Sequence, residues 1–465
     1  MDRLLFGKAI FVSNDTDIWP LFLASLQELV EYESTEPVRT PRNPREVADE
    51  LSLALTSAGT SMETVLDQLV QIAKLTPATS TPQFFNQLFG GRIDIATVAE
   101  MFAAFLNSSM YTYKVAGPQV LVERTLIDKM AQLSGFSAGD GSFTPGGSMS
   151  NMLALIIARE ELVASPYNQP SPARAPLMYT SDQGHYSVRK NAMFTGVGRE
   201  NLRTVPSDHR GRMEPEALEA QIEQDLAQGH QPFFLNLTAG TTVLGAFDEI
   251  TPLTAVARRH GLWVHVDGAM GGSLLLSDEH RSLLDGLAEV DSFTWDAHKL
   301  MGVPLTSSVC LFRERGLLEK HLAEIADYLF TPDDPLLDPG LTSLQCGRRN
   351  DALKVWAAWK QLGDDGYANR INNMMEMAKY AGTKVDQSPH LSLTRDPESI
   401  NVVFTIDGVD PHDLCQSLLE HARAMVGYAT VDDVPVVRLA IAAPSTREAI
   451  DTFFGSVEQT VNELR

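Results

Sequence analysis

Cysteine is scarce in this chain, and the few cysteines lie far apart. Only three occur among the 465 residues, Cys310, Cys346 and Cys415, and no two have the spacing of a redox or metal-binding pair. Isolated cysteines are typical of proteins in a reducing compartment, and a structural zinc site needs clustered ligands. The sequence therefore predicts neither a disulfide-stapled domain nor a metal site.

Basic residues are also few. The 37 lysines and arginines are outnumbered by 60 aspartates and glutamates, which gives a formal net charge of -23. So acidic a chain repels phosphate, and nucleic acid is therefore not an expected partner. An anionic substrate would need a local cationic pocket against this background.

Long apolar runs are missing too. No stretch approaches the roughly 18 apolar residues that a membrane span requires. The apolar stretch near the N-terminus is short and is broken by Lys8, unlike a signal peptide. A cytoplasmic protein with no membrane partner is the resulting expectation.

The chain is predicted to begin with a helical segment over residues 1–77. Asn43-Pro44 is a typical helix start, and it precedes apolar residues at helical spacing over 45–59. The same spacing recurs over 60–75 and ends before a proline. These helices could pack on the rest of the chain or cross to a second subunit.

A large central part, residues 78–349, alternates apolar strands with helices. The expected strands are 177–180, 202–205, 232–237, 262–266, 292–295 and 308–312. This alternation predicts an α/β fold with a largely parallel, doubly wound sheet. Residues 350–465 are predicted to form a small C-terminal α+β domain with strands over 401–406 and 434–441.

Polar side chains stand just after four of these strands. His185, Thr238, Asp267 and Lys299 each follow an apolar strand. Ligands of doubly wound sheets bind beyond the carboxyl ends of the strands. We therefore expect these four residues to meet in one site.

Asp267 and Lys299 are the residue types that pyridoxal 5'-phosphate (PLP) chemistry needs. An amine set in apolar surroundings stays partly unprotonated, so the lysine can condense with the cofactor aldehyde. The carboxylate can keep the pyridine nitrogen protonated, so that the ring accepts electrons from a bond breaking at the substrate Cα. The pair predicts PLP as cofactor and an enzyme that acts on an amino group.

A phosphate cradle is predicted at the helix start Gly146-Gly-Ser-Met-Ser-Asn151. Glycines and hydroxyls at a helix N-terminus expose N–H groups to an anion, and the helix dipole adds to the attraction. His298, beside the lysine, could hydrogen-bond the same phosphate. His185 could stack on the cofactor ring and handle protons.

Each of these residues also has a commoner structural role. Most lysines are solvated, a strand-end aspartate often closes a turn, a serine often caps a helix, and a lone histidine usually satisfies a hydrogen bond. Their joint order along the chain, however, favours the cofactor interpretation.

This order of motifs resembles the group II PLP-dependent decarboxylases, a fold-type-I family that includes glutamate, cysteine sulfinate and aromatic amino acid decarboxylases. The resemblance extends from about residue 78 to the C-terminus. The motifs that carry it are FFNQLFGG, NSSMYTYKVAGP, FTPGGSMSNMLAL, YTSDQGHYSVRK, LNLTAGTTVLGAFD, HVDGAMGG, WDAHKLMGVPL and LQCGRRND.

The resemblance implies roles for individual residues. Lys299 would carry the cofactor, Asp267 would bind the pyridine nitrogen, His185 would stack on the ring as a base, and Ala269 would lie against the opposite ring face. The other implied cofactor contacts are Gly147, Ser148, Thr238 and His298. The family further implies a homodimer with its active site at the subunit interface.

Four residues resemble the branch that acts on acidic substrates. There, residues matching Gln87 and Arg438 bind the distal carboxylate of the substrate, and arginine meets a carboxylate with two parallel hydrogen bonds. Ser109 and Tyr111 resemble the cysteine sulfinate branch. We therefore expect decarboxylation of a small acidic L-amino acid, with aspartate or cysteine sulfinate favoured and glutamate next.

The sequence departs from the family in two places. Asp296 stands where many relatives have asparagine, and a carboxylate is unfavourable beside a phosphate unless it faces away or is protonated. The loop over 329–344, where many relatives carry a proton-donating tyrosine, has no Tyr, His, Lys or Cys, and Tyr328 at its edge matches another family position. The missing loop donor suggests one alternative, decarboxylation-dependent oxidative deamination to an aldehyde. A PLP-binding pseudoenzyme is a separate alternative, against which the intact Lys299, Asp267 and His185 argue.

Overall fold

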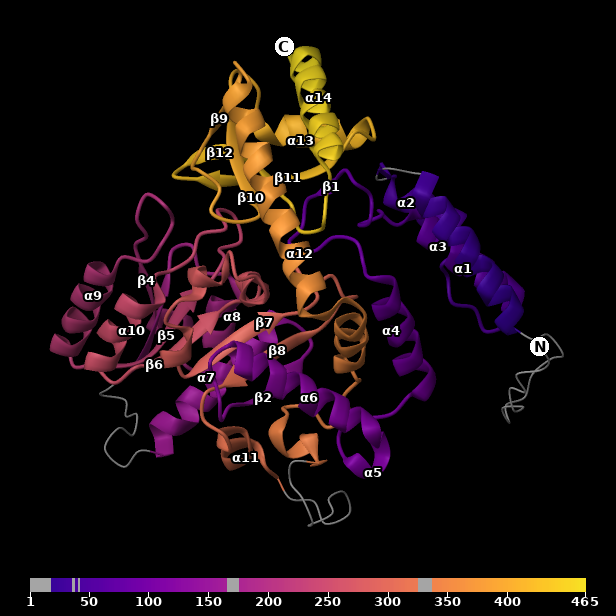
Figure 1. Ribbon diagram of the computed structural model, residues 1–465. Helices are drawn as coiled ribbons and strands as arrows, with labels where there is room; N and C mark the ends of the chain where they lie inside the picture. Colours follow the sequence, from indigo (N-terminus) through magenta and orange to yellow (C-terminus); the bar gives the residue numbers. More distant parts are fainter. Residues whose placement is uncertain (1–17, 36–37, 41, 165–174, 325–336) are drawn as a thin grey trace.

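The computed structural model describes residues 18–35, 38–40, 42–164, 175–324 and 337–465. Two sheets organise the chain, a seven-stranded one below and a five-stranded one above in Figure 1. Within the described residues, no helix combines the length and the apolar character needed to cross a membrane.

The seven-stranded sheet is largely parallel, as predicted. Its strands, in the order β2-β8-β7-β6-β5-β3-β4, are β2 (Asp140–Thr144), β8 (Ser308–Phe312), β7 (Ser292–Asp296), β6 (Trp263–Asp267), β5 (Gln231–Thr238), β3 (Pro176–Ser181) and β4 (Leu202–Val205). Neighbours from β7 to β4 are parallel, whereas β8 runs antiparallel to both β7 and β2. The carboxyl ends of β3, β5, β6 and β7 therefore share one edge.

Helices cover both faces of this sheet. The helices of this part of the chain, not all of which touch the sheet, are α4 (Asp94–Leu106), α5 (Tyr113–Ala116), α6 (Pro118–Leu133), α7 (Gly147–Ala164), α8 (Ser187–Phe194), α9 (Pro215–Ala227), α10 (Ile250–Arg259) and α11 (Leu317–Leu322). Alternate strand residues face opposite layers: Met178 packs with α7 and α8, whereas Leu177 and Tyr179 join the core that contains α6, α9 and α10. Short 3-10 turns complete the connections: η1 (Arg199–Asn201), η2 (Gly271–Leu276), η3 (Arg281–Leu284), η4 (Leu287–Glu289) and η6 (Pro339–Thr342).

The five-stranded sheet belongs mainly to the C-terminal part. Its order is β1 (Phe84–Phe85), β11 (Met425–Val431), β12 (Val434–Ala440), β10 (Asn401–Ile406) and β9 (Leu391–Leu393), and α13 (Pro411–Glu420) and α14 (Arg447–Leu464) lie beside it. The sequence predicted β10 and β12 closely. It placed residues 84–85 in the central part, whereas β1 pairs with β11 in parallel.

One long helix joins the two sheets. α12 (Ala352–Gln387) departs from helical backbone angles at Gly363, where φ is 66°. After this kink, Tyr367, Ile371 and Met374 belong to the large core, whereas Ala378 and Ala381 belong to the core of the five-stranded sheet. A single helix therefore contributes to both cores.

Three N-terminal helices lie at one side of the molecule (Figure 1): α1 (Ile18–Thr35), α2 (Pro44–Glu50) and α3 (Met62–Leu75). Asn43 caps α2 as predicted, since its side chain accepts a hydrogen bond from Arg45 N. The helix predicted over 45–59 is too long, because α2 ends at Glu50 and Ser52 has a left-handed φ of 50°.

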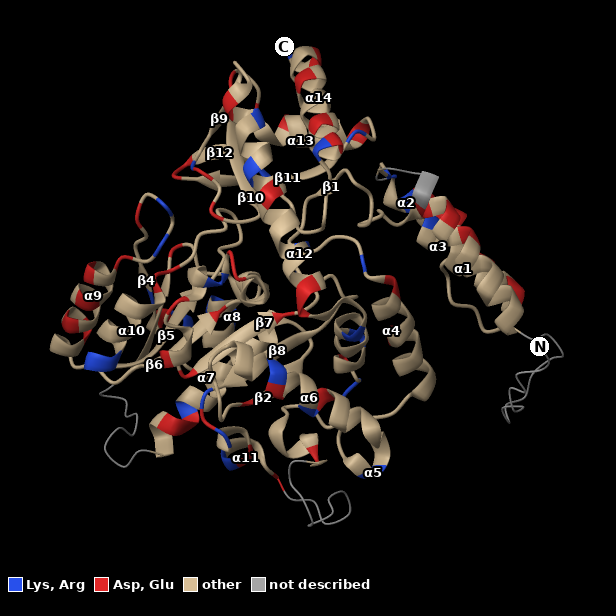
Figure 2. Ribbon diagram, in the orientation of Figure 1, with Lys and Arg blue, Asp and Glu red and all other residues tan. Residues whose placement is uncertain are grey.

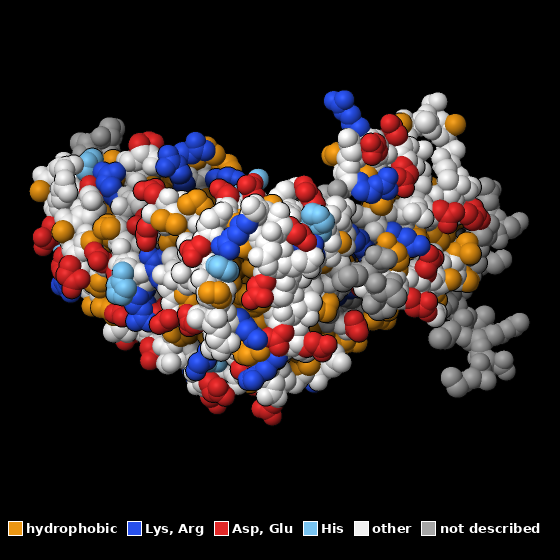
Figure 3. Space-filling view, turned by 90° about the horizontal axis from the view of Figure 1, so that it is seen from above, with side chains coloured by type: hydrophobic (Ala, Val, Ile, Leu, Met, Phe, Trp, Pro, Cys, Tyr) orange, Lys and Arg blue, Asp and Glu red, His pale blue; other side chains and the backbone are white. Residues whose placement is uncertain are grey.

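Charge is spread over the whole molecule. Acidic and basic side chains are interspersed along the ribbon (Figure 2), and the face in Figure 3 presents both signs beside hydrophobic side chains. A local cationic site must therefore come from individual residues rather than from the net charge of -23.

Candidate active site

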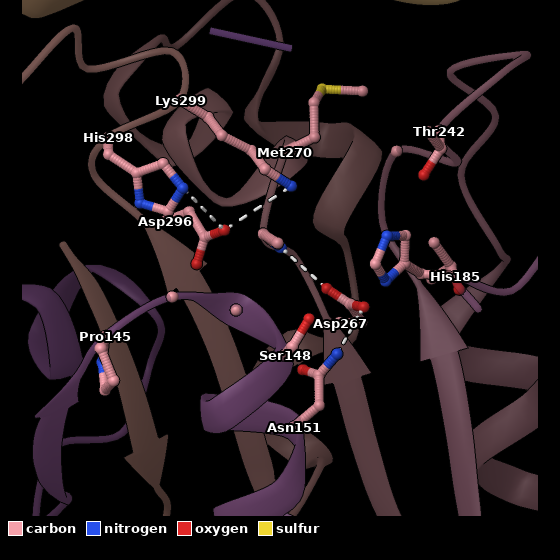
Figure 4. A pocket seen from close by; sticks show the side chains of 15 residues that line it. Pro145, Ser148, Asn151, His185, Thr242, Asp267, Met270, Asp296, His298 and Lys299 are labelled. Carbon is pink, nitrogen blue, oxygen red and sulfur yellow. Dashed lines mark hydrogen bonds and ion pairs between the residues drawn. The ribbon is translucent and has the colours of Figure 1, made fainter. Parts of the chain in front are cut away.

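A cavity of about 240 Å³ opens at the shared carboxyl edge of the large sheet (Figure 4). Residues that end or follow β3, β5, β6 and β7 line it, together with the first turn of α7. All eight residues predicted around the cofactor are among its lining: Gly147, Ser148, His185, Thr238, Asp267, Ala269, His298 and Lys299. The fold thus brings together residues that are up to 152 positions apart, from 147 to 299.

Lys299 points into the cavity beside a buried carboxylate. Its Nζ lies 3.6 Å from Asp296 Oδ2, and His298 Nε2 lies at the same distance from that oxygen. Asp296 is 2% exposed, and its Oδ1 has no hydrogen-bond partner among the described residues. The carboxylate of Asp296, which stands where many relatives have asparagine, therefore faces the cavity.

The first turn of α7 offers backbone N–H groups to the cavity. Gly146 has a φ of 122°, and a Cβ on Gly147 would lie 2.8 and 2.9 Å from the two carboxylate oxygens of Asp296. Only glycine fits at position 147 without displacing that side chain. His298 is fixed nearby, because its Nδ1 lies 2.8 Å from Ser307 O and can donate to it, which directs Nε2 toward Asp296.

Asp267 is held from two sides. Asn151 Nδ2 donates to Oδ2 at 2.6 Å, and Ala269 N donates to Oδ1 at 3.1 Å. The carboxylate is 5% exposed, at the end of β6. Hydrogen bonds donated to a carboxylate favour its ionised form, so the side chain is suited to holding a cationic group in the cavity.

His185 faces Asp267 across the cavity (Figure 4). Its Nδ1 lies 2.7 Å from Ser187 Oγ, and its ring packs against Tyr186 with centroids 4.3 Å apart. Burial lowers the pKa of His185 below its ordinary value, and this outweighs the opposite effect of Asp267. The imidazole is therefore neutral at neutral pH.

The residues present fit a phosphorylated pyridine aldehyde, except for Asp296, whose buried carboxylate lies beside Gly147 and His298 and opposes a phosphate there. A helix N-terminus without room for a side chain suits a phosphate, Lys299 suits the aldehyde, and Asp267 suits the ring nitrogen. Thr238 Oγ1 is buried and has no hydrogen-bond partner among the described residues, so a polar ligand atom could satisfy it. PLP combines all of these features.

The four candidate substrate residues do not line this cavity in a single chain. Arg438 lies on β12, where its Nη1 donates to Asn86 O at 3.1 Å, next to the exposed Gln87. Ser109 Oγ accepts from Arg348 N at 3.3 Å, and the ring of Tyr111 packs against Gly340. Tyr328 and residues 329–336 of the predicted loop lie outside the described residues, which resume at 337.

Sequence reasoning missed two residues that act on Asp267 or share its environment. Asn151 was noted only as the end of the glycine-rich helix start, although it lies one turn after Gly147 and therefore on the same helix face. His265 precedes Asp267 by two residues in β6, so both point to the same side of the sheet. The spacing of four between Gly147 and Asn151, and of two between His265 and Asp267, could have indicated that these residues lie near the site. Thr242 and Met270 also line the cavity, without a comparable signal.

Comparisons with known proteins identify similar sequences and a similar fold. The family model described as the pyridoxal-dependent decarboxylase conserved domain matches residues 44–407. Human cysteine sulfinic acid decarboxylase is 41% identical over 368 residues, which cover 78% of this chain and 75% of the relative. Glutamate decarboxylase of Drosophila melanogaster is 34% identical and covers 92% of this chain and 89% of its own. A crystal structure of mouse CSAD superimposes with a TM-score of 0.90 at 34% identity, over 96% of this chain and 99% of that one.

Proposed function

Because this chain belongs to the pyridoxal-dependent decarboxylase family and uses PLP, we propose that it removes the α-carboxylate of a small acidic L-amino acid. Aspartate and cysteine sulfinate are the favoured substrates, and glutamate is next. Relatives named cysteine sulfinic acid decarboxylase and glutamate decarboxylase support an acidic substrate class.

Different cavity residues would have different roles in holding PLP and supporting decarboxylation. When bound, PLP supplies the electron sink for the pair released as the bond between Cα and the carboxylate breaks. Lys299 would hold the cofactor aldehyde and release it to the substrate amine, and Asp267 would keep a proton at the pyridine nitrogen. His185, neutral at neutral pH, would contact the ring. The remaining residues would hold the phosphate and the ring: Gly147, Ser148, Thr238, Ala269 and His298.

The environment of Arg438 is the observation that supports an acidic substrate most strongly. Burial lowers the pKa of its guanidinium to about 10, its Nε has no hydrogen-bond partner, and no carboxylate among the described residues pairs with it. Burying a cation without a counter-ion is costly. A guanidinium in this state suits the distal carboxylate or sulfinate of a substrate, and Gln87, Ser109 and Tyr111 would complete the pocket.

The test is an assay of the PLP-loaded protein with aspartate, cysteine sulfinate, glutamate, DOPA and diaminobutyrate. We expect one amine per CO2 from aspartate or cysteine sulfinate. Arg438→Ala should raise KM for these acids by about 100-fold, as expected for loss of a charge-assisted pair. The control is Arg447→Ala, because Arg447 is 64% exposed and pairs only at the surface. Equal turnover of DOPA, or an unchanged KM in Arg438→Ala, would refute the acidic substrate.

The same assay distinguishes simple decarboxylation from the second candidate function, which is decarboxylation with oxidation to an aldehyde. A loop without a proton donor leaves the carbon that lost CO2 open to O2, which would give an aldehyde, ammonia and hydrogen peroxide. The absence of Tyr, His, Lys and Cys over 329–344 motivates this alternative. Peroxide in proportion to CO2 would favour it, whereas amine without peroxide would exclude it.

A homodimer is the second part of the proposal. Apolar side chains of α1, α3 and α4 are exposed on the single chain, including Leu23 at 60% and Phe105 at 63%, and Trp19 contacts Phe105 edge to face. An apolar surface of this kind marks an interface. An active site at the subunit interface is part of this proposal, because the four candidate substrate residues do not line the cavity of a single chain.

We expect the protein to sediment at about twice the 51.0 kDa of the chain. Phe105→Asp should shift it toward the monomer, because burying a carboxylate in an apolar interface is unfavourable. Leu226→Asp, on exposed α9, is the control and should leave the mass unchanged. A monomeric wild type would contradict the proposed assembly.

The three cysteines support a cytoplasmic location. Cys310 and Cys415 are buried and Cys346 is exposed, and all three are free thiols. Free thiols persist in reducing compartments.

A further inference from the structure

Buried polar side chains form a continuous hydrogen-bond chain behind Asp267. Trp263 Nε1 lies 2.8 Å from Ser292 Oγ, and that oxygen lies 2.9 Å from His265 Nδ1. His265 Nε2 lies 3.0 Å from Asn151 Oδ1, and Asn151 Nδ2 lies 2.6 Å from Asp267 Oδ2. The chain thus connects the core of the sheet to the carboxylate in the cavity.

The carboxylate end of this chain imposes a direction on it. An ionised carboxylate can only accept, which requires the amide nitrogen of Asn151 to face Asp267 and its Oδ1 to face His265. A neutral imidazole then carries its proton on Nε2 and donates it to Asn151 Oδ1, which leaves Nδ1 as an acceptor. Ser292 Oγ accepts from the indole N–H of Trp263 and can donate its own proton to Nδ1, so the serine end is compatible with this direction.

The environment of His265 supports a neutral ring. The side chain is fully buried between the sheet and α7, and burial lowers the pKa of His265 to about 4. The groups that face it are the hydroxyls of Ser292 and Thr294, the backbone of Ser292, the amide of Asn151 and the ring of Phe234 at 6.0 Å. The hydrogen bond to the Ser292 backbone raises the pKa of His265, but burial has the larger effect. Asp267, which favours the protonated form, is the charged group acting on it.

We propose that Asn151 and His265 are positioning residues for the carboxylate that binds the pyridine nitrogen. His265 fixes the amide of Asn151, and that amide donates to Asp267 Oδ2, which stabilises the anion and leaves its other lone pairs for the ligand. The hydrogen-bond chain thereby keeps the shared proton on the pyridine nitrogen rather than on Asp267. This inference rests on the proposed function, because it takes Asp267 as the pyridine partner.

The test compares variants of the PLP-loaded protein. Asn151→Ala and His265→Leu should lower kcat by about 10- to 100-fold, the size expected for losing a hydrogen bond to a charged group, with KM changed less than about threefold. His265→Gln should stay within about threefold of wild type, because its amide nitrogen can replace Nε2 as the donor to Asn151. Asn350→Ala is the control, since Asn350 is equally buried but hydrogen-bonds Gln119 and Leu353 N instead.

A second measurement separates positioning from folding. With PLP carrying ¹⁵N at the pyridine nitrogen, the resonance should indicate a protonated nitrogen in wild type, His265→Gln and Asn350→Ala. It should move toward the unprotonated position in Asn151→Ala and His265→Leu. Ser292→Ala, which removes only a hydroxyl, should show a smaller shift in the same direction and provides a variant that folds if the larger changes do not.

Two outcomes would overturn the inference. One is an unchanged resonance in Asn151→Ala and Ser292→Ala, and the other is equal impairment of His265→Gln and His265→Leu. Asp267→Asn distinguishes this failure from failure of the proposed function. If Asp267→Asn shifts the resonance and Asn151→Ala does not, Asp267 remains the pyridine partner and only the positioning role is wrong.

Discussion

Exchange of Lys299 for arginine is expected to reduce decarboxylation by at least about four orders of magnitude. A guanidinium stays protonated at any physiological pH and cannot condense with an aldehyde. Its positive charge would still face Asp296, which lies 3.6 Å from the lysine amine. The variant therefore removes the chemistry while retaining the local charge balance.

The measurement pairs kcat with covalent capture of the cofactor. After borohydride reduction and denaturation, the wild-type chain should retain one PLP, seen by mass spectrometry, and Lys299→Arg should retain none. Lys360→Arg, an exposed position on α12, should behave as wild type in both respects. Residual activity above about 1% in Lys299→Arg would mean that another amine serves as the cofactor lysine.

Exchange of Asp267 for asparagine is expected to lower kcat by about a thousandfold. The amide matches the shape of the carboxylate but cannot stabilise a proton on the pyridine nitrogen, so the ring becomes a weaker electron sink. One of the two donors now facing the carboxylate, Asn151 Nδ2 and Ala269 N, would also oppose an NH2 group. Cofactor affinity should fall less, because the phosphate contacts are untouched.

The assay follows kcat, KM and the PLP dissociation constant together. A kcat within tenfold of wild type would show that Asp267 has a structural role and that another group holds the ring nitrogen. A loss confined to PLP affinity, recovered at saturating cofactor, would lead to the same conclusion. Glu289→Gln, on the 3-10 turn η4 outside the cavity lining, is the control for a change of carboxylate to amide.

The chain is a PLP-dependent decarboxylase, and much of the lining of its candidate cofactor cavity was predictable from sequence. Each candidate followed an apolar strand, and parallel strands place their carboxyl ends at one edge. Residues more than a hundred positions apart in the sequence could therefore be predicted to lie close together in space. Lys299, Asp267, His185 and Thr238 were placed at this edge in that way.

Strands and contacts that depend on residues far apart in the sequence were not predictable from the local sequence pattern. β1 is a strand of two residues whose partner lies about 340 positions later, and β2 is a short strand rich in glycine and polar residues. Asn151 acts through a contact with Asp267 that only the docking of α7 on β6 creates. The candidate substrate residues lie outside the cavity of one chain, so their assembly, like the division at 77 and 349, stays a prediction.

The helix α12 has a consequence for the order of folding. Its segment after Gly363 is continuous, and it begins in the large core with Tyr367 and ends in the small one with Ala381. Starting a helix is unfavourable, whereas extending one adds a hydrogen bond for each residue fixed. Once the large core has secured the first turns, the later turns can grow from them and present a ready surface to β10 and β12. The large core can thus act as a template for the smaller sheet, because four of its five strands, β9 to β12, leave the ribosome after the large sheet is complete.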